Sequence, residues 1–471
     1  MMRILHLGTG YPPITGGGLT LYAMGLMAAQ AAAGHSVHYL CVGAFDLLFA
    51  TRRVTWPIGS VQVHEIRNPR SDSIHIGRNA RPALDLGDRR TECLVDRVLD
   101  EVRPDVVHIQ SLLGWPASVV GPIKDGGYPA ILTVQNYQGL CPTTRLYDEV
   151  GGEVCEDFAG GRRCVRCNAA RPSAAKLRNA QRLTLGRRDS LRARLATAAA
   201  AAARRLRAAG HARPGSSLPA VLPAGSSLSE AFPERRRAFV AALNRVDLVV
   251  GMSHRVSELL ARYGVEESRL RTLNLVLGDL ERIERRPPRV APRPVRFGLL
   301  NKLTHLKGAD VLRQAWEGLD PAAARLLVFG AQSDAAAKTI WPLVERGLVE
   351  LCGPYRREDL GIILAGVDVG LVPSIWEEPY GFAGIEFLAA GIPVLGSRIG
   401  GIPDYVEHEV NGLLLPPADP AAWRAAIGKL ADRPDEIKRL AGGIRPAKTM
   451  QAHLAEVFEL YREASVVGTS Q

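Results

Sequence analysis

Two carboxylates, Glu378 and Glu386, lie within the segment 373–386, where a short apolar run gives way to a loop and then to a helical pattern. The helix is expected to begin near Gly381 or Phe382, which places Glu386 about one turn inside it. The unpaired backbone N–H groups of a helix start suit a phosphate, and carboxylates accept hydrogen bonds from sugar or ribose hydroxyls. A first-turn glutamate can also serve only to stabilise the helix dipole. The segment as a whole predicts a binding site for a phosphorylated, hydroxyl-rich compound.

Two cations, Lys302 and Lys307, stand in the segment 298–308, at an expected junction of strand, loop and helix. Cations so placed can clamp a diphosphate from two directions. The alternative for either lysine is an ordinary solvated charge.

Three consecutive glycines, Gly16, Gly17 and Gly18, fall between the first expected strand and the first expected helix. Glycine accepts positive φ and lets the backbone approach an anion closely, so this loop is a second candidate phosphate contact; a flexible turn is the alternative. A nicotinamide fingerprint would need Gly-x-Gly-x-x-Gly, but Pro13 occupies the third glycine position here. The loop therefore argues against a dinucleotide enzyme.

Strands and helices that alternate along the chain must position these residues. Short β-rich runs occur at 4–7, 37–42, 106–110, 131–135, 248–251, 295–300, 325–329, 349–351, 369–372, 393–396 and 412–415, with helical stretches such as 19–33, 308–318 and 382–390 between them. This alternation predicts an α/β fold of parallel sheets covered on both faces. Ligands of such sheets bind beyond the carboxyl ends of the strands, which is where the candidate residues fall.

The chain of 471 residues is long enough for two domains and an insertion. Four prolines in 284–294 predict an interdomain linker. We therefore expect a Rossmann-like, doubly wound N-terminal domain over 1–283, a second such domain over 295–445 with a cleft between them, and a C-terminal helix in 446–471 that returns to the first domain. The segment 171–235 breaks the rhythm and is expected to be an insertion.

The segment 373–386 resembles the Glu-x7-Glu motif of the retaining glycosyltransferases of family 4, which have the GT-B fold, with Tyr380 in place of the usual Phe. The segments 390–404 and 411–416 fit that family too, and the likeness extends over 1–140 and 240–465. It implies that Glu378 contacts the donor sugar and Glu386 the ribose of a nucleotide-sugar. The donor-binding residues that it implies are Gly16, Gly17, Gly18, Lys302, Lys307, Glu378, Tyr380, Gly381, Phe382, Ala383 and Glu386.

The resemblance also implies a mechanism, in which the departing diphosphate helps to deprotonate the acceptor hydroxyl and no metal is required. Lys307 matches the family's lysine, whereas Lys302 stands where arginine is usual and lacks its planar fork. Gln135 stands where the family has a histidine at the reaction centre, and it cannot become a cation or a base. Glu378, Lys307, Lys302 and Gln135 are thus the expected catalytic residues. His108, at the end of another strand, is a secondary candidate or a structural histidine.

Three functions follow from the resemblance. The main hypothesis is a transferase that takes a UDP- or GDP-sugar donor and a glycan, glycoside or lipid-linked acceptor. A nucleotide-sugar epimerase or hydrolase is an alternative within the same fold. A catalytically silent nucleotide-sugar-binding partner is the alternative from another class, and Gln135 is its sequence hint.

Four cysteines crowd into the loop 141–167. They form the pattern Cys-x13-Cys-x8-Cys-x2-Cys with Cys141, Cys155, Cys164 and Cys167. Four thiolates satisfy a closed structural zinc site, and an iron–sulfur cluster takes the same ligands. Disulfides and free thiols are the alternatives.

The net charge of +11 is concentrated in one basic arm. Residues 176–213 hold ten Arg and one Lys against one Asp, so the rest of the chain carries about +1. A basic amphipathic helix can lie on anionic lipid, and a solvated charge run is the alternative. The arm has no aromatic residue for base stacking, which argues against nucleic acid. Without a secretory signal or an apolar stretch of about 20 residues, we expect a cytoplasmic protein, peripheral at most to the inner face of the membrane.

Overall fold

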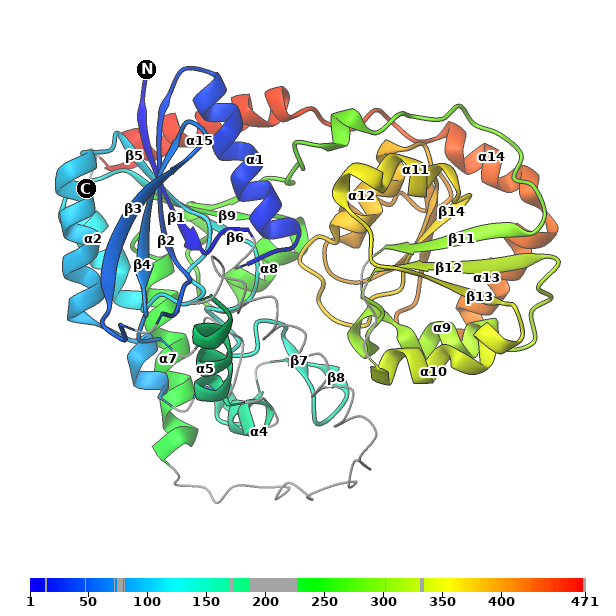
Figure 1. The fold of residues 1–471 in the computed structure, drawn as a ribbon, viewed down its shortest axis with the longest axis horizontal. Helices are drawn as coiled ribbons and strands as arrows, with labels where there is room; N and C mark the ends of the chain where they lie inside the picture. The colour runs from blue at the N-terminus through cyan, green and yellow to red at the C-terminus, as the bar shows by residue number, and fades with distance from the viewer. Residues whose placement is uncertain are drawn as a thin grey trace. The chain divides into compact units, whose positions relative to one another are not determined.

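The computed structural model describes residues 1–12, 15–46, 48–71, 73, 79, 81–156, 158–169, 171, 173–185, 227–300, 302–330 and 334–468. The chain divides into two compact units (Figure 1). Unit 1 comprises Met1–Val250, Leu260–Arg271 and Glu456–Gln471, and unit 2 comprises Gly251–Leu259 and Thr272–Ala455.

An eight-stranded sheet forms the centre of unit 1, in the order β10-β9-β6-β5-β1-β2-β4-β3. The strands are β1 (Arg3–Thr9), β2 (Ser36–Val42), β3 (Arg52–Ile58), β4 (Val61–Arg67), β5 (Val106–Ile109), β6 (Ala130–Val134), β9 (Leu248–Gly251) and β10 (Leu270–Thr272). β1 is parallel to both β2 and β5, because its neighbours are reached through helical crossovers. The central strands are buried throughout, as expected for parallel strands covered on both faces.

Helices and one small hairpin surround this sheet. They are α1 (Gly18–Ala32), α2 (Arg89–Val102), α3 (Val120–Asp125), α4 (Cys164–Ala169), α5 (Ala174–Leu185), α7 (Ser227–Leu243), the hairpin β7 (Tyr147–Asp148) with β8 (Glu153–Val154), and the part of α15 (Met450–Gly468) that begins at Glu456. Helix α8 (His254–Arg262) contributes residues to both units. The C-terminal helix from Glu456 onwards thus groups with the first unit.

A six-stranded parallel sheet forms the centre of unit 2, in the order β13-β12-β11-β14-β15-β16. Its strands are β11 (Val295–Leu300), β12 (Ala324–Phe329), β13 (Val349–Gly353), β14 (Val369–Val372), β15 (Val394–Ser397) and β16 (Gly412–Leu415), and its helices are α9 (Ala309–Trp316), α10 (Asp334–Glu345), α11 (Leu360–Ala365), α12 (Phe382–Ala389), α13 (Pro420–Asp432) and α14 (Pro434–Gly442). The strand order reverses between β11 and β14, which pair in register at Phe297 and Val369. The loops that follow these two strands therefore begin side by side, at the place where open parallel sheets bind ligands.

The prediction of two doubly wound α/β units is confirmed, but two local features differ from expectation. The antiparallel pair β3 and β4 was missed, because its alternating polar residues give no buried apolar run. The proline-rich segment 284–294 lies inside unit 2. Arg286 donates to the carbonyl of Val367 at 2.6 Å, and Arg289 pairs with Asp368 at 3.1 Å, so arginines hold this extended segment against the sheet.

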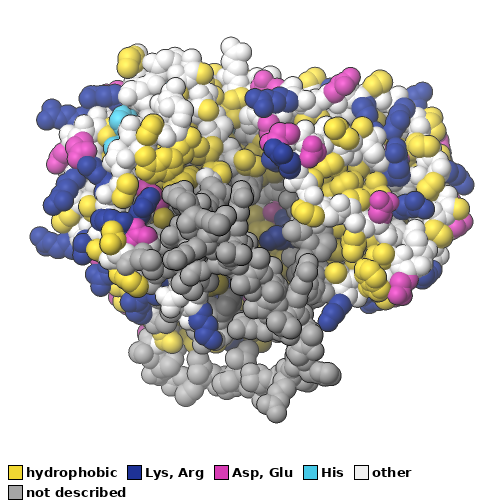
Figure 2. All heavy atoms as spheres, viewed as in Figure 1, with side chains coloured by type: hydrophobic (Ala, Val, Ile, Leu, Met, Phe, Trp, Pro, Cys, Tyr) yellow, Lys and Arg dark blue, Asp and Glu magenta, His cyan; other side chains and the backbone are white. Residues whose placement is uncertain are grey.

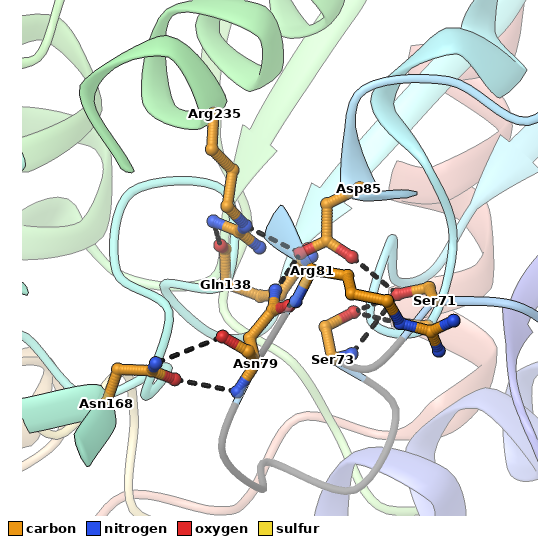
Figure 3. A network of polar contacts seen from close by, with 9 residues as sticks. Ser71, Ser73, Asn79, Arg81, Asp85, Gln138, Asn168 and Arg235 are labelled. Carbon is orange, nitrogen blue, oxygen red and sulfur yellow. Dashed lines mark hydrogen bonds and ion pairs between the residues drawn. The ribbon is translucent and has the colours of Figure 1, made fainter. Parts of the chain in front are cut away.

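A buried ion pair joins distant segments of unit 1 (Figure 3). The Asp85 carboxylate accepts hydrogen bonds from Arg235 Nε at 2.6 Å, from the Ser71 hydroxyl at 2.6 Å and from Asn79 Nδ2 at 2.9 Å. Arg235 on α7 also donates to the carbonyl of Gln138 at 2.9 Å. The pair thus ties α7 to two loops that follow strands of the sheet.

Outside the basic arm the chain carries a net charge of about +1. On the face shown in Figure 2, Lys and Arg side chains are interspersed with Asp and Glu. Residues 186–226, which hold most of the predicted arm and insertion, lie outside the described residues. Among the helices that are described, none combines the length and the apolar character needed to cross a bilayer.

Candidate active site

Lys307 and Glu378 form an ion pair in unit 2, although 71 positions separate them in the chain. Lys307 ends the short turn His305–Lys307 after β11, and Glu378 lies in the loop after β14. The Ser374 hydroxyl donates to the same Glu378 carboxylate oxygen at 2.9 Å. The Lys307 ammonium also lies 5.7 Å from the centre of the Trp376 ring. The strand reversal therefore brings together the cation and the carboxylate that the sequence predicted separately.

Glycines let the surrounding loops approach this pair closely. Gly308 has φ +79°, and a Cβ there would lie 2.2 Å from the carbonyl oxygen of Pro373. Gly400 has φ +59°, and a Cβ there would lie 2.1 Å from the carbonyl oxygen of Glu378. The Gly401 N–H donates to that same carbonyl at 2.8 Å. Larger residues would push the loops apart, so these glycines maintain the position of Glu378.

Helix α12 begins at Phe382, four positions after Glu378. Gly381 precedes the helix with φ +82°, and the Tyr405 hydroxyl donates to its carbonyl at 3.1 Å. Gly381 and Phe382 are half-buried, whereas Ala383 is buried. The first N–H groups of a helix lack partners within it and carry a partial positive charge, so this turn suits an anionic group next to Glu378.

Glu386, one turn into α12, is only 3% exposed and pairs with Arg357. Arg357 also donates two hydrogen bonds, both of 2.9 Å, to the two carboxylate oxygens of Asp279. Burial raises the pKa of Glu386, and the Arg357 guanidinium opposes that rise. Sequence reasoning found Glu386 but missed Arg357 and Asp279, because neither belongs to a recognisable motif and both are distant from Glu386 in the chain.

Replacing Arg357 with alanine should leave the Glu386 carboxylate buried beside a second carboxylate and without its cation. We expect the free energy of unfolding to fall by about 2 kcal/mol at neutral pH, less than for a fully buried pair because Arg357 is partly exposed. The pKa of Glu386 should rise further. An acid whose pKa is higher in the folded state costs no stability while it is protonated, and it destabilises the fold as rising pH ionises it. Glu386 should be mostly protonated at pH 5 and ionised at pH 8 in the variant. The variant should therefore be less impaired at pH 5 than at pH 8. Thermal unfolding at both pH values measures this.

The adjacent Arg356 provides a matched control for that measurement, since it is exposed and pairs only with the exposed Glu358 among the described residues. Arg356→Ala should change stability by less than about 1 kcal/mol. If Arg357→Ala lost equal stability at pH 5 and pH 8, Arg357 would not be the cation that keeps Glu386 ionised.

Two further predicted donor residues occupy different surroundings. Lys302 is exposed and forms no ion pair with the residues that the structure describes. Tyr380 is buried, with its ring centre 5.9 Å from that of Phe382 and 5.4 Å from that of Tyr405. It lines a cavity of about 420 Å³ whose walls also include Asp404 and Leu388 but none of the predicted cations or glutamates. Tyr380 thus packs against the rings of Phe382 and Tyr405 and lines this cavity.

The glycine run of unit 1 is open. Gly17 caps α1 with φ +112°, and a Cβ at Gly16 or Gly17 would have no described atom within 4 Å. Gly18 is the first residue of the helix. The loop follows β1, next to β5, where the strand order of the first sheet also reverses. Among the described atoms of unit 1, none therefore blocks a ligand from approaching Gly16 and Gly17.

Gln135 follows β6 and is 4% exposed. Its amide nitrogen donates to Gln110 Oε1 at 2.8 Å, and it lines a small cavity of about 30 Å³ in unit 1. His108 is buried and hydrogen-bonded through both ring nitrogens, to the Tyr461 hydroxyl and the Thr133 hydroxyl, both at 2.8 Å. These bonds favour the structural interpretation of His108.

The four clustered cysteines of unit 1 are free thiols. They lie close enough for Cys141, Cys155 and Cys167 all to raise the pKa of Cys164, after the larger effect of burial. However, no three His, Cys, Asp or Glu side chains among the described residues are arranged to hold a metal ion. The Cys167 thiol instead donates to Asp148 at 3.3 Å.

The structure therefore does not support the zinc or iron–sulfur site that the cysteine spacing predicted. Burial raises the pKa of Cys164 and Cys167, so without a metal both are thiols near neutral pH. The metal stays a prediction. Metal analysis of the purified chain tests it, and less than about a tenth of an equivalent of zinc or iron would contradict it.

Comparisons with known proteins agree with this geometry. Residues 294–433 match the family model described as Glycosyl transferases group 1. A D-inositol 3-phosphate glycosyltransferase of Saccharomonospora viridis is 30% identical over 241 residues, which cover 46% of this chain and 55% of that protein. The chain thus matches about half the length of this curated relative.

Solved structures resemble the whole chain. Anabaena HepE in complex with UDP has a TM-score of 0.58 at 15% identity, with all of both chains covered. Sucrose-phosphate synthase from Thermosynechococcus elongatus has a TM-score of 0.61 at 17% identity, with 98% of each chain covered. The two α/β units and these likenesses show the GT-B fold, and residues 294–433 match the glycosyl transferases group 1 model.

Proposed function

We propose that this protein is a retaining glycosyltransferase that moves a sugar from a nucleotide-sugar to the hydroxyl of a glycan, glycoside or lipid-linked acceptor. The observation that carries the proposal is the ion pair of Lys307 and Glu378 beside the N-terminus of α12. It combines a cation, a carboxylate and unpaired helix N–H groups within the matched glycosyl transferases domain. The UDP bound to Anabaena HepE supports a uridine nucleotide as the first donor to test.

In the proposed reaction the two glutamates bind the donor, and Lys307 and helix α12 stabilise the leaving group. Glu378 accepts hydrogen bonds from the donor sugar, and Glu386, oriented by Arg357, accepts them from the ribose. The bond between the anomeric carbon and the diphosphate oxygen breaks, and the acceptor oxygen forms the new bond on the same face. The acceptor proton passes to the departing diphosphate. Lys307 and the N–H groups at α12 stabilise the negative charge that develops on that leaving group.

The deciding experiment is a panel of UDP-, GDP- and ADP-sugars assayed for release of the nucleoside diphosphate, with and without candidate acceptors. Acceptor-dependent release, with an unchanged anomeric configuration in the product, supports the proposal. Release without an acceptor indicates a hydrolase, and interconversion of donor sugars indicates an epimerase. Binding without turnover indicates a silent partner, an outcome to which Gln135 draws attention because it replaces an ionisable histidine.

A further inference from the structure

Seven buried side chains of unit 1 form a continuous chain of hydrogen bonds that runs from Gln135, directly after β6, to Thr133 on β6. Its links are Gln135 Nε2 to Gln110 Oε1 (2.8 Å), Gln110 Nε2 to His6 Nδ1 (3.1 Å), His6 Nε2 to Gln30 Oε1 (2.6 Å), Gln30 Nε2 to the Tyr461 hydroxyl (2.9 Å), that hydroxyl to His108 Nδ1 (2.8 Å) and His108 Nε2 to the Thr133 hydroxyl (2.8 Å). We call this set the relay. It joins β1, β5 and β6 with α1 and the C-terminal helix α15.

The direction of the links follows from the placement of the Gln30 amide, whose oxygen faces His6 and whose nitrogen faces the Tyr461 hydroxyl. Burial lowers the pKa of His6 to about 4, so its ring is neutral near pH 7 and carries one proton. Its Nε2 faces the carbonyl oxygen of Gln30 and must donate, so its Nδ1 must accept. Gln110 therefore donates from Nε2 to His6 and turns its Oε1 towards Gln135.

The remaining links run in the same sense. The Tyr461 hydroxyl accepts from Gln30, so its single proton goes to His108 Nδ1. His108 then donates from Nε2 to Thr133. Burial keeps the pKa of Tyr461 well above its usual range, with Tyr22 also adjacent, so this hydroxyl keeps its proton near neutral pH. Each inner side chain of the relay accepts one hydrogen bond and donates the next. Reversing any single link would therefore leave a buried donor facing another donor.

Gln135 is the end of the relay that meets the small cavity. Its nitrogen is committed to Gln110, and its Oε1 accepts no hydrogen bond from any residue in the described part of the chain. Gln138 lines the same cavity, and its Nε2 is buried without a partner among the described residues. A cavity of about 30 Å³ admits one hydroxyl-sized group. A hydroxyl can donate to one amide oxygen and accept from another amide nitrogen.

We infer that the relay fixes Gln135 as a hydrogen-bond acceptor for a hydroxyl of a bound sugar, with Gln110 and His6 as its positioning residues. This inference rests on the proposed function for the identity of the ligand. At position 135, where the resembled family has a histidine, this chain thus presents an amide oxygen that is held in one orientation and does not ionise. Gln138 Nε2 supplies the hydrogen-bond donor to the same hydroxyl.

Gln135→His tests the direction of this hydrogen bond. Gln110 Oε1 should require the facing ring nitrogen to carry a proton, which leaves the other nitrogen to accept from the ligand. We expect sugar transfer by this variant to fall as pH decreases below about 6.5, because a protonated imidazole cannot accept. Wild type should show no such loss. A variant that becomes more active on acidification would overturn the inference, because Gln135 would then act as a donor.

Gln110 variants test positioning separately from packing. Gln110→Leu removes both links and should lower kcat/KM for transfer at least tenfold. Gln110→Glu keeps an acceptor oxygen for Gln135 but loses the donor to His6, so it should recover part of that loss. Thr133→Val is the matched control, because it removes one buried link at the far end; it should change kcat/KM less than about twofold. Equal losses for all three variants would mean that the relay serves stability alone and would overturn the inference.

A measurement that needs no turnover keeps the two proposals distinguishable. In the full chain with ¹⁵N-labelled histidine, NMR should show His6 as the neutral Nε2–H tautomer from pH 7 to about pH 5. The Nδ1–H tautomer would overturn the relay even if transfer is observed. Absence of transfer with the expected tautomer would instead refute the proposed function and leave the relay intact.

Discussion

Lys307→Ala is expected to lower kcat for sugar transfer by roughly a hundredfold or more. Its ammonium pairs with Glu378 in the loop after β14 and lies where we propose that the leaving diphosphate gains charge. A preorganised donor of this kind is worth about 2.7–4 kcal/mol in the transition state, because it acts without reorganisation. The measurement is kcat at saturating donor, determined after thermal unfolding has shown that the variant is folded.

Two comparisons accompany Lys307→Ala. Lys307→Arg keeps the charge and should retain more activity than alanine. Lys429 on α13 is exposed, and Lys429→Ala should leave kcat unchanged. If Lys307→Ala turned over at the wild-type rate, Lys307 would have no role in stabilising the leaving group.

Asp85→Ala is expected to destabilise unit 1 by about 3–5 kcal/mol. The Asp85 and Arg235 side chains are 0% and 2% exposed, so the variant would leave the Arg235 charge buried and unpaired. Ser71 and Asn79 would lose their common acceptor as well (Figure 3). Native-state hydrogen exchange of the unit 1 amides measures the change, since unfolding of a two-unit chain is not described by one transition.

The double variant Asp85→Leu, Arg235→Met separates charge burial from packing. Replacing both partners with apolar residues should restore much of the stability lost in Asp85→Ala. Glu101 pairs with Arg53 at the surface, and Glu101→Ala should cost less than about 1 kcal/mol. If Asp85→Ala cost no more than Glu101→Ala, the buried pair would not be a major contributor to the stability of unit 1.

Local features of the fold were predictable because they depend on residues close together in the chain. The apolar run before residue 373 and the glycine at 381 are enough to predict the strand, loop and helix that carry Glu378 and Glu386. The antiparallel edge of β3 and β4 was missed because polar and charged residues interrupt both strands and leave no continuous apolar run.

The partners of the site residues were not predictable, because they come from separate elements. No pattern in the sequence connects Arg357 with Glu386 and Asp279, which meet only when the loops after several strands converge. The cysteine pattern is a case in which spacing alone predicted more than the described side chains show. Spacing predicted a metal site, yet the folded loop brings the thiols near one another without arranging three ligands around one point among the described residues.

The sequence by itself determined the α/β alternation, the motif of the two glutamates and the cations that accompany it, because hydrophobic periodicity and turn residues act over a few positions. Only the tertiary structure decided that Lys307 pairs with Glu378, that Arg357 neutralises Glu386 and that Gln135 is oriented through Gln110 and His6. The reason is that ion pairs and hydrogen bonds depend on distances of about 3 Å between atoms, and strand order rather than chain position sets those distances.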